Sequence, residues 1–104
     1  MKPKNVLVFM TSTPGKYLVG DSYTKVDEVR DRVNLENPVQ MNIQQKPEGD
    51  GKHVFLNPLL VFEQLTVDVR SYEGFGYLKG ELKEKFEKWK YNRETHDQIF
   101  KDDD

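Results

Sequence analysis

Lys16 and Tyr17 place a basic side chain next to an aromatic ring near the start of the chain. Lys2 and Lys4 belong to the same basic stretch, because residues 1–20 contain three lysines and no acidic residue. An aromatic ring can stack on a nucleic-acid base while a neighbouring lysine binds the phosphate backbone. A strand tyrosine also packs within a sheet, so Lys16 and Tyr17 indicate either a binding surface or an ordinary part of the core.

Catalysis has much weaker support in the sequence. The two histidines, His53 and His96, lie in different segments, and a surface or structural role explains each of them. Four acidic residues fall between positions 21 and 31: Asp21, Asp27, Glu28 and Asp31. A turn with a solvated edge explains these carboxylates, and magnesium binding is the alternative. No nucleophile motif or phosphate-binding glycine loop is present, so we expect no enzyme, no cofactor and no metal site.

The composition favours a small all-β domain. The chain has 104 residues, no cysteine and no alanine, whereas valine, a strong strand former, occurs eleven times. The net charge of −2 argues against indiscriminate binding along duplex DNA, where phosphate neutralisation dominates the affinity. No apolar stretch is long enough to span a membrane or to form a signal-peptide core, so we expect a cytoplasmic protein without a membrane partner.

The first two predicted strands already indicate a curled sheet. Residues 6–10 form a short apolar run that is typical of a buried strand. Pro14-Gly15 then predicts a type II turn before a second strand at residues 17–25. Gly20 inside the second strand indicates a bulge or a close backbone approach, which is a usual device for sharp curvature.

Residues 29–44 read as one long third strand with a bend near its middle. After the bend, apolar residues alternate with glutamine and asparagine, which is the period of a half-buried strand. Asn37-Pro38 interrupts the run, and proline has no N–H to donate to a ladder, so we expect the bend there. A long bent strand in a small chain allows a sheet to curl into a barrel.

Two short apolar runs, residues 53–56 and 59–62, follow a turn and predict the fourth and fifth strands. Asn57-Pro58 separates the two runs and predicts a corner between opposite sides of the barrel. Residues 65–69 alternate between apolar and polar types and form a further strand-like segment.

The last third of the chain changes its period. We expect a barrel over residues 1–70, a linker at 71–77, a helix at 78–100 and an acidic tail at 101–104. One apolar stripe runs along the predicted helix, formed by Leu78, Leu82, Phe86 and Trp89. A helix of this length needs tertiary contacts, so the stripe must dock on the barrel or on a neighbouring subunit.

The start of the long strand carries a short motif. Val33-Asn34-Leu35 places an asparagine between two apolar residues, Asp31 precedes it, and Gly20 lies in the strand before. In this arrangement the chain resembles the Sm-like (LSm) family, whose first motif combines such a glycine with an aspartate and an apolar–Asn–apolar run. Asp31 lies one residue closer to Asn34 than the family pattern has it.

The resemblance covers residues 5–63, and the second family motif is absent. Where the family has Arg-Gly between its last two strands, this chain has Asn57-Pro58. The resemblance implies an all-β, strongly bent, five-stranded antiparallel SH3-like (Sm-like) barrel, here with an added C-terminal α-helix. It also implies a closed homo-oligomeric ring of five to seven subunits, in which free strand edges pair between neighbours.

The resemblance further implies a site for single-stranded RNA, or DNA, at the loops that face the centre of the ring. By position, Asn34 would hydrogen-bond a base edge and Arg32 would stack on a base, with Asp31 beside them. Asn57 would replace the arginine of the second motif, offering an amide without charge. Asn34 has a second interpretation, in which it only ties the bent strand to a neighbour.

Two functions from different classes therefore stand. The first is a non-enzymatic, ring-forming Sm-like protein that binds single-stranded RNA or DNA during nucleic-acid processing. The second is a structural or assembly module whose ring and helix contact other proteins. The chain is similar in general character to small Sm-like proteins of phage or marine metagenomic origin, which would place a phage-encoded member in the host cytoplasm.

Overall fold

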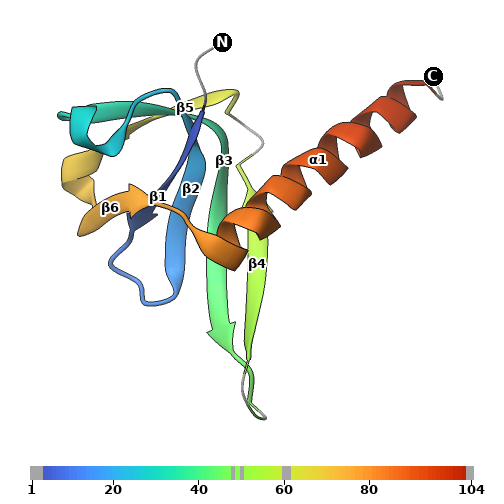
Figure 1. The fold of residues 1–104 in the computed structure, drawn as a ribbon, viewed down its shortest axis with the longest axis horizontal. Coiled ribbons are helices and arrows are strands. Elements are labelled where there is room, and N and C mark those ends of the chain that lie inside the picture. The colour runs from blue at the N-terminus through green and yellow to red at the C-terminus, as the bar shows by residue number, and fades with distance from the viewer. Residues whose placement is uncertain (1–3, 48, 50, 60–61, 103–104) are drawn as a thin grey trace.

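The computed structural model describes residues 4–47, 49, 51–59 and 62–102, which form a bent antiparallel sheet and one long helix (Figure 1). The strands are β1 (Asn5–Met10), β2 (Lys16–Ser22), β3 (Arg32–Gln45), β4 (Lys52–Pro58), β5 (Gln64–Asp68) and β6 (Gly74–Tyr77). The short 3-10 turns are η1 (Val26–Glu28) and η2 (Val69–Ser71), and the helix is α1 (Gly80–Asp102). A mainly β, antiparallel fold with a C-terminal helix is therefore confirmed.

The long third strand organises the sheet. Neighbouring strands follow the order β4–β3–β2–β1–β6, and β5 pairs with β3 outside this path. Residues 32–36 of β3 pair with β5, whereas residues 39–45 pair with β4. Within the described part of the chain, no strand pair joins β6 to β4 or β5, so the sheet curls without a closing row of backbone pairs.

The predicted bend and the predicted bulge are both confirmed. β3 changes partner across Asn37-Pro38, and Asn37 has a positive φ of 51°. Opposite this bend, the pairing of β2 with β3 shifts register between Val19 and Asp21. The shift encloses Gly20, where a Cβ atom would lie only 2.8 Å from the Cβ of Leu35. A bare glycine therefore lets the two backbones approach where the sheet turns.

Residues 71–77, predicted to be a linker, contain β6 instead. β6 pairs antiparallel with β1, and the Phe75 ring stacks on Phe9 with centroids 5.6 Å apart. The two glycines of this segment suggest a loop locally, but contact with β1 decides its conformation. Residues 65–69 correspond to β5 and the start of η2. The predicted strand at 59–62 includes positions 60 and 61, which lie outside the described residues.

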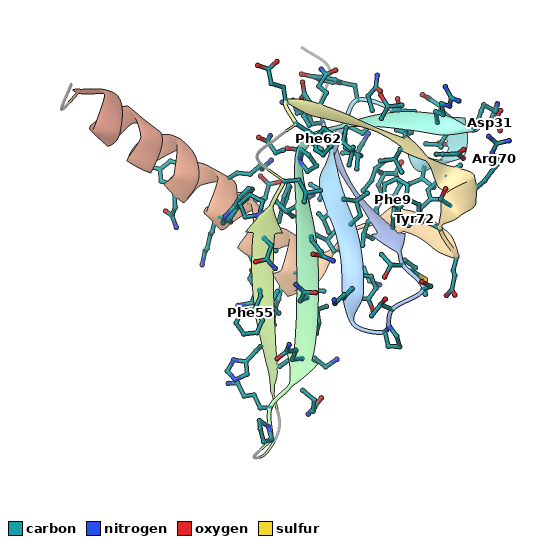
Figure 2. The ribbon with its side chains drawn as sticks, turned by 180° about the vertical axis from the view of Figure 1, so that it is seen from behind. Phe9, Asp31, Phe55, Phe62, Arg70 and Tyr72 are labelled. Atoms are coloured by element: carbon teal, nitrogen blue, oxygen red, sulfur yellow. The ribbon has the colours of Figure 1, made fainter. Side chains whose placement is uncertain are left out.

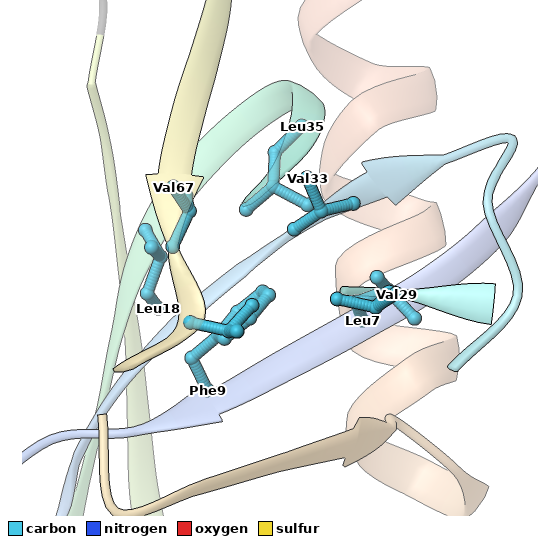
Figure 3. Packing of buried hydrophobic residues seen from close by; sticks show 8 residues of the cluster. Leu7, Phe9, Leu18, Val29, Val33, Leu35 and Val67 are labelled. Atoms are coloured by element: carbon cyan, nitrogen blue, oxygen red, sulfur yellow. The ribbon is translucent and has the colours of Figure 1, made fainter. Parts of the chain in front are cut away.

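The sheet has an apolar core on each face. The first core lies inside the curled sheet and includes Leu7, Phe9, Leu35 and Val67 (Figure 3). The second core lies between the outer face and α1, and its buried members are Val6, Val19, Val39, Met41, Leu78 and Phe86. The apolar stripe predicted for the helix therefore docks on the sheet. No helix in the described residues is both long and apolar enough to cross a membrane.

We predict that Gly20→Ala lowers the free energy of unfolding by about 1–3 kcal/mol, because its Cβ would press against Leu35 and the Glu36 carbonyl. The measurement is urea denaturation followed by circular dichroism. Gly76→Ala is the matched control, since a Cβ there meets nothing within 4 Å. Equal losses in the two variants would contradict the role given to Gly20.

Candidate nucleic-acid interface

The residues predicted to bind nucleic acid do not form one cluster. Asp31, Arg32 and Asn34 lie at the end of β3 that pairs with β5, where their side chains are exposed. Lys16 and Asn57 lie beside the opposite half of β3. Figure 2 shows Asp31 and Phe55 at far ends of the molecule, one at the β5 corner and the other on β4. The bend in β3 separates the two groups.

At the β5 corner the charges are mixed and partly paired. The Asp68 carboxylate accepts hydrogen bonds from Nε and Nη2 of Arg70, both at 3.0 Å. These bonds, together with the Arg70 backbone N–H, hold the pKa of Asp68 below its ordinary value. Arg32 is the register partner of Asp68, and the Asp31 carbonyl accepts a 3.0 Å hydrogen bond from the Val69 N–H in the same corner. The corner therefore has both signs of charge rather than a basic patch.

Asn34 has a partner within the sheet. The Thr66 hydroxyl donates a 2.7 Å hydrogen bond to Asn34 Oδ1, across the register pair that joins β3 to β5. This contact fits the second interpretation of Asn34, in which the amide ties the bent strand to a neighbour. Its Oδ1 is engaged, so any contact with a base edge would fall mainly to the Nδ2 group.

Lys16 and Asn57, two more of the predicted residues, lie on one continuous face. On an antiparallel sheet, directly opposed residues share one side. Lys16 opposes Asn42, which in turn opposes Phe55, and Gln40 opposes Asn57 in the next row. Gln44 and His53 form the third row. We define these residues as the hairpin face: Lys16, Gln40, Asn42, Gln44, His53, Phe55 and Asn57.

The hairpin face continues the inner side of the sheet beyond the first core. Leu18 lies in the same row as Gln40 and Asn57 but is buried in that core. Past Leu18, the β3–β4 hairpin projects beyond the other described strands (Figure 1). Side chains there change from aliphatic to amide, imidazole and phenyl, so this half of the sheet presents polar groups to solvent.

An aromatic platform lies on the β4 side of the hairpin face. The rings of His53 and Phe55 stack with centroids 6.0 Å apart at an interplanar angle of 30°. Phe55 is 47% exposed although it lies in a strand, and its side chain projects away from the ribbon in Figure 2. Asn42 opposes Phe55, and its buried Oδ1 has no hydrogen-bond partner among the described residues.

Tyr17 and Lys4 do not contribute to the basic–aromatic surface expected from the sequence. Tyr17 opposes Met41 and packs with the second core, on the opposite side of the sheet from Lys16. Lys4 precedes β1, at the end where β1 meets the end of β2, whereas Lys16 begins β2. Lys4 Nζ instead lies 2.7 Å from Glu36 Oε2. Lys2 lies outside the described residues.

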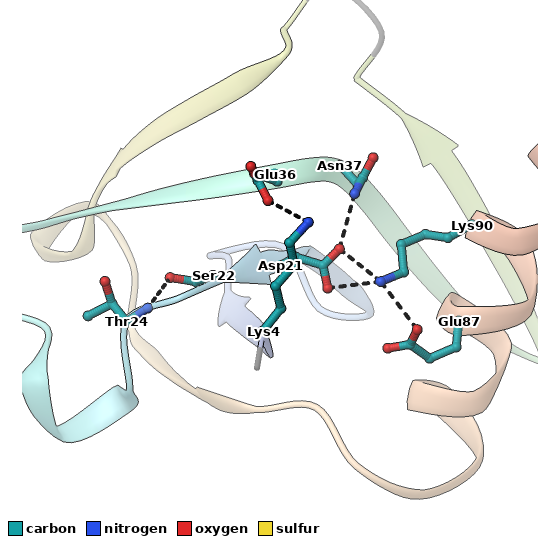
Figure 4. A network of polar contacts seen from close by, with 8 residues as sticks. All are labelled: Lys4, Asp21, Ser22, Thr24, Glu36, Asn37, Glu87 and Lys90. Atoms are coloured by element: carbon teal, nitrogen blue, oxygen red, sulfur yellow. Dashed lines mark hydrogen bonds and ion pairs between the residues drawn. The ribbon is translucent and has the colours of Figure 1, made fainter. Parts of the chain in front are cut away.

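The acidic group predicted to be a solvated turn contains a buried member. Asp21 is 1% exposed, and its carboxylate contacts Lys90 Nζ at 2.9 and 3.0 Å (Figure 4). Asn37 Nδ2 donates a 3.1 Å hydrogen bond to the same carboxylate. Within the described residues, no three His, Asp or Glu side chains gather closely enough to hold a metal ion. Asp21 therefore links the bend in β3 to α1.

The sequence contains signals for the platform, but they lie in two separate strands. His53, Phe55 and Asn57 alternate with Val54 and Leu56, the period of a strand with one apolar and one polar side. The alternation of asparagine and glutamine in the second half of β3 is the matching signal. The pairing register of β3 with β4 brings these two sets of side chains onto one face of the sheet.

No protein-family model matches the chain, and neither does any curated protein or any solved structure. The Sm-like assignment therefore stays a prediction.

We predict that Lys90→Met lowers the free energy of unfolding by about 3–5 kcal/mol, because it leaves the buried Asp21 carboxylate without a cation. Thermal and urea denaturation would measure the loss. Adding Asp21→Asn to the same chain should recover much of it. Lys88→Met, on the exposed side of α1, is the control and should change little. A Lys90→Met protein as stable as that control would contradict the role of the ion pair.

Proposed function

We propose that this chain binds single-stranded RNA or DNA on the hairpin face. The exposed stack of His53 and Phe55, surrounded by amide side chains, is the observation that supports this function most directly. Bases of single strands stack on flat side chains, and each base stacked in this way contributes about 1–3 kcal/mol. Phe55 is 47% exposed, so its ring offers a surface on which one base can stack.

The surrounding side chains suit base edges. Gln40, Asn42, Gln44 and Asn57 offer both N–H donors and carbonyl acceptors, which is what the Watson–Crick edge of an unpaired base requires. Lys16 at one edge of the face supplies a positive charge for a phosphate.

Charge favours binding through bases rather than along the backbone. The chain has a net charge of −2, and the hairpin face has one lysine. For single strands, the slope of log K against log salt is about −0.7 for each phosphate that is neutralised. We therefore assign a shallow salt dependence to this site, in contrast to the steep dependence of basic duplex-binding proteins.

The ring predicted from the family resemblance stays part of the proposal. β4 and β6 terminate the strand order, so each has a free edge, and β5 pairs only with β3 among the described strands. Unpaired edges are liabilities that proteins cover, and pairing between copies is one way to cover them. A ring of five to seven subunits would place several hairpin faces side by side, and a cytoplasmic location would give it access to nucleic acid.

An assembly module is the second candidate function. The mixed charges at the β5 corner and the absence of the Arg-Gly motif favour this candidate, because neither suits a phosphate backbone. In that case the free edges and α1 would contact other proteins, and nucleic acid would not bind at all.

We predict that Phe55→Ala weakens binding to a fluorescein-labelled oligouridine or oligoadenosine roughly 5- to 150-fold, the equivalent of losing one stacked base. Fluorescence anisotropy is the measurement. Tyr91→Ala removes another exposed aromatic ring, from α1, and should leave the affinity unchanged. Wild-type protein with no anisotropy change for any single-stranded oligonucleotide would support the assembly module instead.

The same titration distinguishes the hairpin face from the β5 corner. Arg32→Ala combined with Asn34→Ala should reduce the affinity less than Phe55→Ala, because Asn34 already bonds Thr66 and Arg32 lies beside Asp68. The slope of log K against log salt should be about −1. A larger effect of the double variant, or a slope steeper than about −3, would move the site to the corner or to a phosphate track.

Ring formation predicts a mass of five to seven chains by light scattering at micromolar concentration. A monomeric mass would contradict the ring. It would not bear on the hairpin face, which the titrations test independently.

A further inference from the structure

A groove lies on the opposite side of the hairpin from the proposed nucleic-acid site. It has a volume of about 550 Å³ and separates the first turns of α1 from the ends of β3 and β4 that meet at the hairpin turn. Its lining includes three aliphatic side chains, Ile43, Val54 and Leu82. These side chains extend the second core, which α1 covers only in part. The groove is therefore an apolar channel that opens to solvent.

The rim of the groove is basic. Three lysines line it: Lys52 from β4, Lys79 before α1 and Lys85 from its second turn. Among the described lining residues, Glu81 alone carries a carboxylate. The start of α1 adds to this potential, because the free N–H groups of a helix N-terminus favour negative charge. An acidic chain thus has a local basic channel with an aliphatic floor, away from the polar hairpin face.

We propose that this groove binds an extended acidic peptide segment of a partner protein that carries leucine or phenylalanine anchor residues. Carboxylates of the segment pair with the three lysines, and a leucine or phenylalanine side chain packs against Ile43, Val54 and Leu82. The described lining residues include no aromatic ring on which a base could stack, so their chemistry suits a peptide better than a nucleic acid. This inference does not depend on nucleic-acid binding at the hairpin face.

The probe is a short fluorescein-labelled peptide in which one leucine and one phenylalanine are flanked by aspartates. Anisotropy with the full chain should show saturable binding that weakens as salt is added. Lys79→Glu combined with Lys85→Glu should weaken binding at least about tenfold, since two attractions become repulsions. Lys83→Glu combined with Lys88→Glu makes the same charge change outside this groove and should have a much smaller effect.

Two further measurements distinguish a loss of binding from a loss of folding. Glu81→Gln removes the carboxylate that the described lining residues contribute and should tighten binding, a gain that an unfolded variant cannot produce. A peptide with serine in place of the leucine and phenylalanine should bind much more weakly, which tests the floor without altering the protein.

The proposal is overturned if the peptide does not bind, if both lysine pairs have equal effects, or if the serine peptide binds as well as the original. It is also overturned if Lys79→Glu with Lys85→Glu abolishes oligonucleotide binding while the peptide fails to bind, because the groove would then be a phosphate surface. Failure of the nucleic-acid proposal gives a different result: no response to oligonucleotides, with peptide binding intact.

Discussion

The buried carboxylate of Asp21 is the constraint on which this structure depends. It follows Gly20, where β2 shifts register so closely against Leu35 that a side chain would collide. It accepts a hydrogen bond from Asn37, the residue with positive φ at the bend of β3, and it pairs with Lys90 of α1. A buried charge without these partners would be strongly destabilising. The bulge, the bend and the docking of the helix are therefore coupled through a single side chain.

That coupling explains why the two halves of β3 differ in role. Residues 32–36 run over the first core and pair with β5, where Asn34 is tied to Thr66. Residues 39–45 leave the body with β4 as an extended hairpin (Figure 1). One side of the hairpin is polar and aromatic, and the other is aliphatic because α1 packs there. The two proposed binding surfaces, for bases and for an acidic peptide, follow from this division.

The sequence predicts those features whose causes are local. Proline cannot join a ladder, so the bend at Asn37-Pro38 can be read from the chain, as can the bulge at Gly20 and the apolar stripe of α1. The burial of Asp21 cannot be predicted in this way, because its partner Lys90 lies 69 positions later in the sequence. Successive side chains of a strand point to opposite faces, so Tyr17 and Lys16 cannot form one surface. The hairpin face depends on the pairing register of β3 with its neighbours, which local sequence patterns do not specify.

We propose that single strands bind the polar inner side of the β3–β4 hairpin. Residues 31–35, on the other half of β3, are then not the binding surface. A titration of isotope-labelled protein with a single-stranded oligonucleotide, followed by nuclear magnetic resonance, tests it most directly. We expect the largest shifts in the side-chain amides of Gln40, Asn42, Gln44 and Asn57 and in the ring of Phe55. Shifts confined to residues 31–34, or no shifts at saturating oligonucleotide, would contradict the claim.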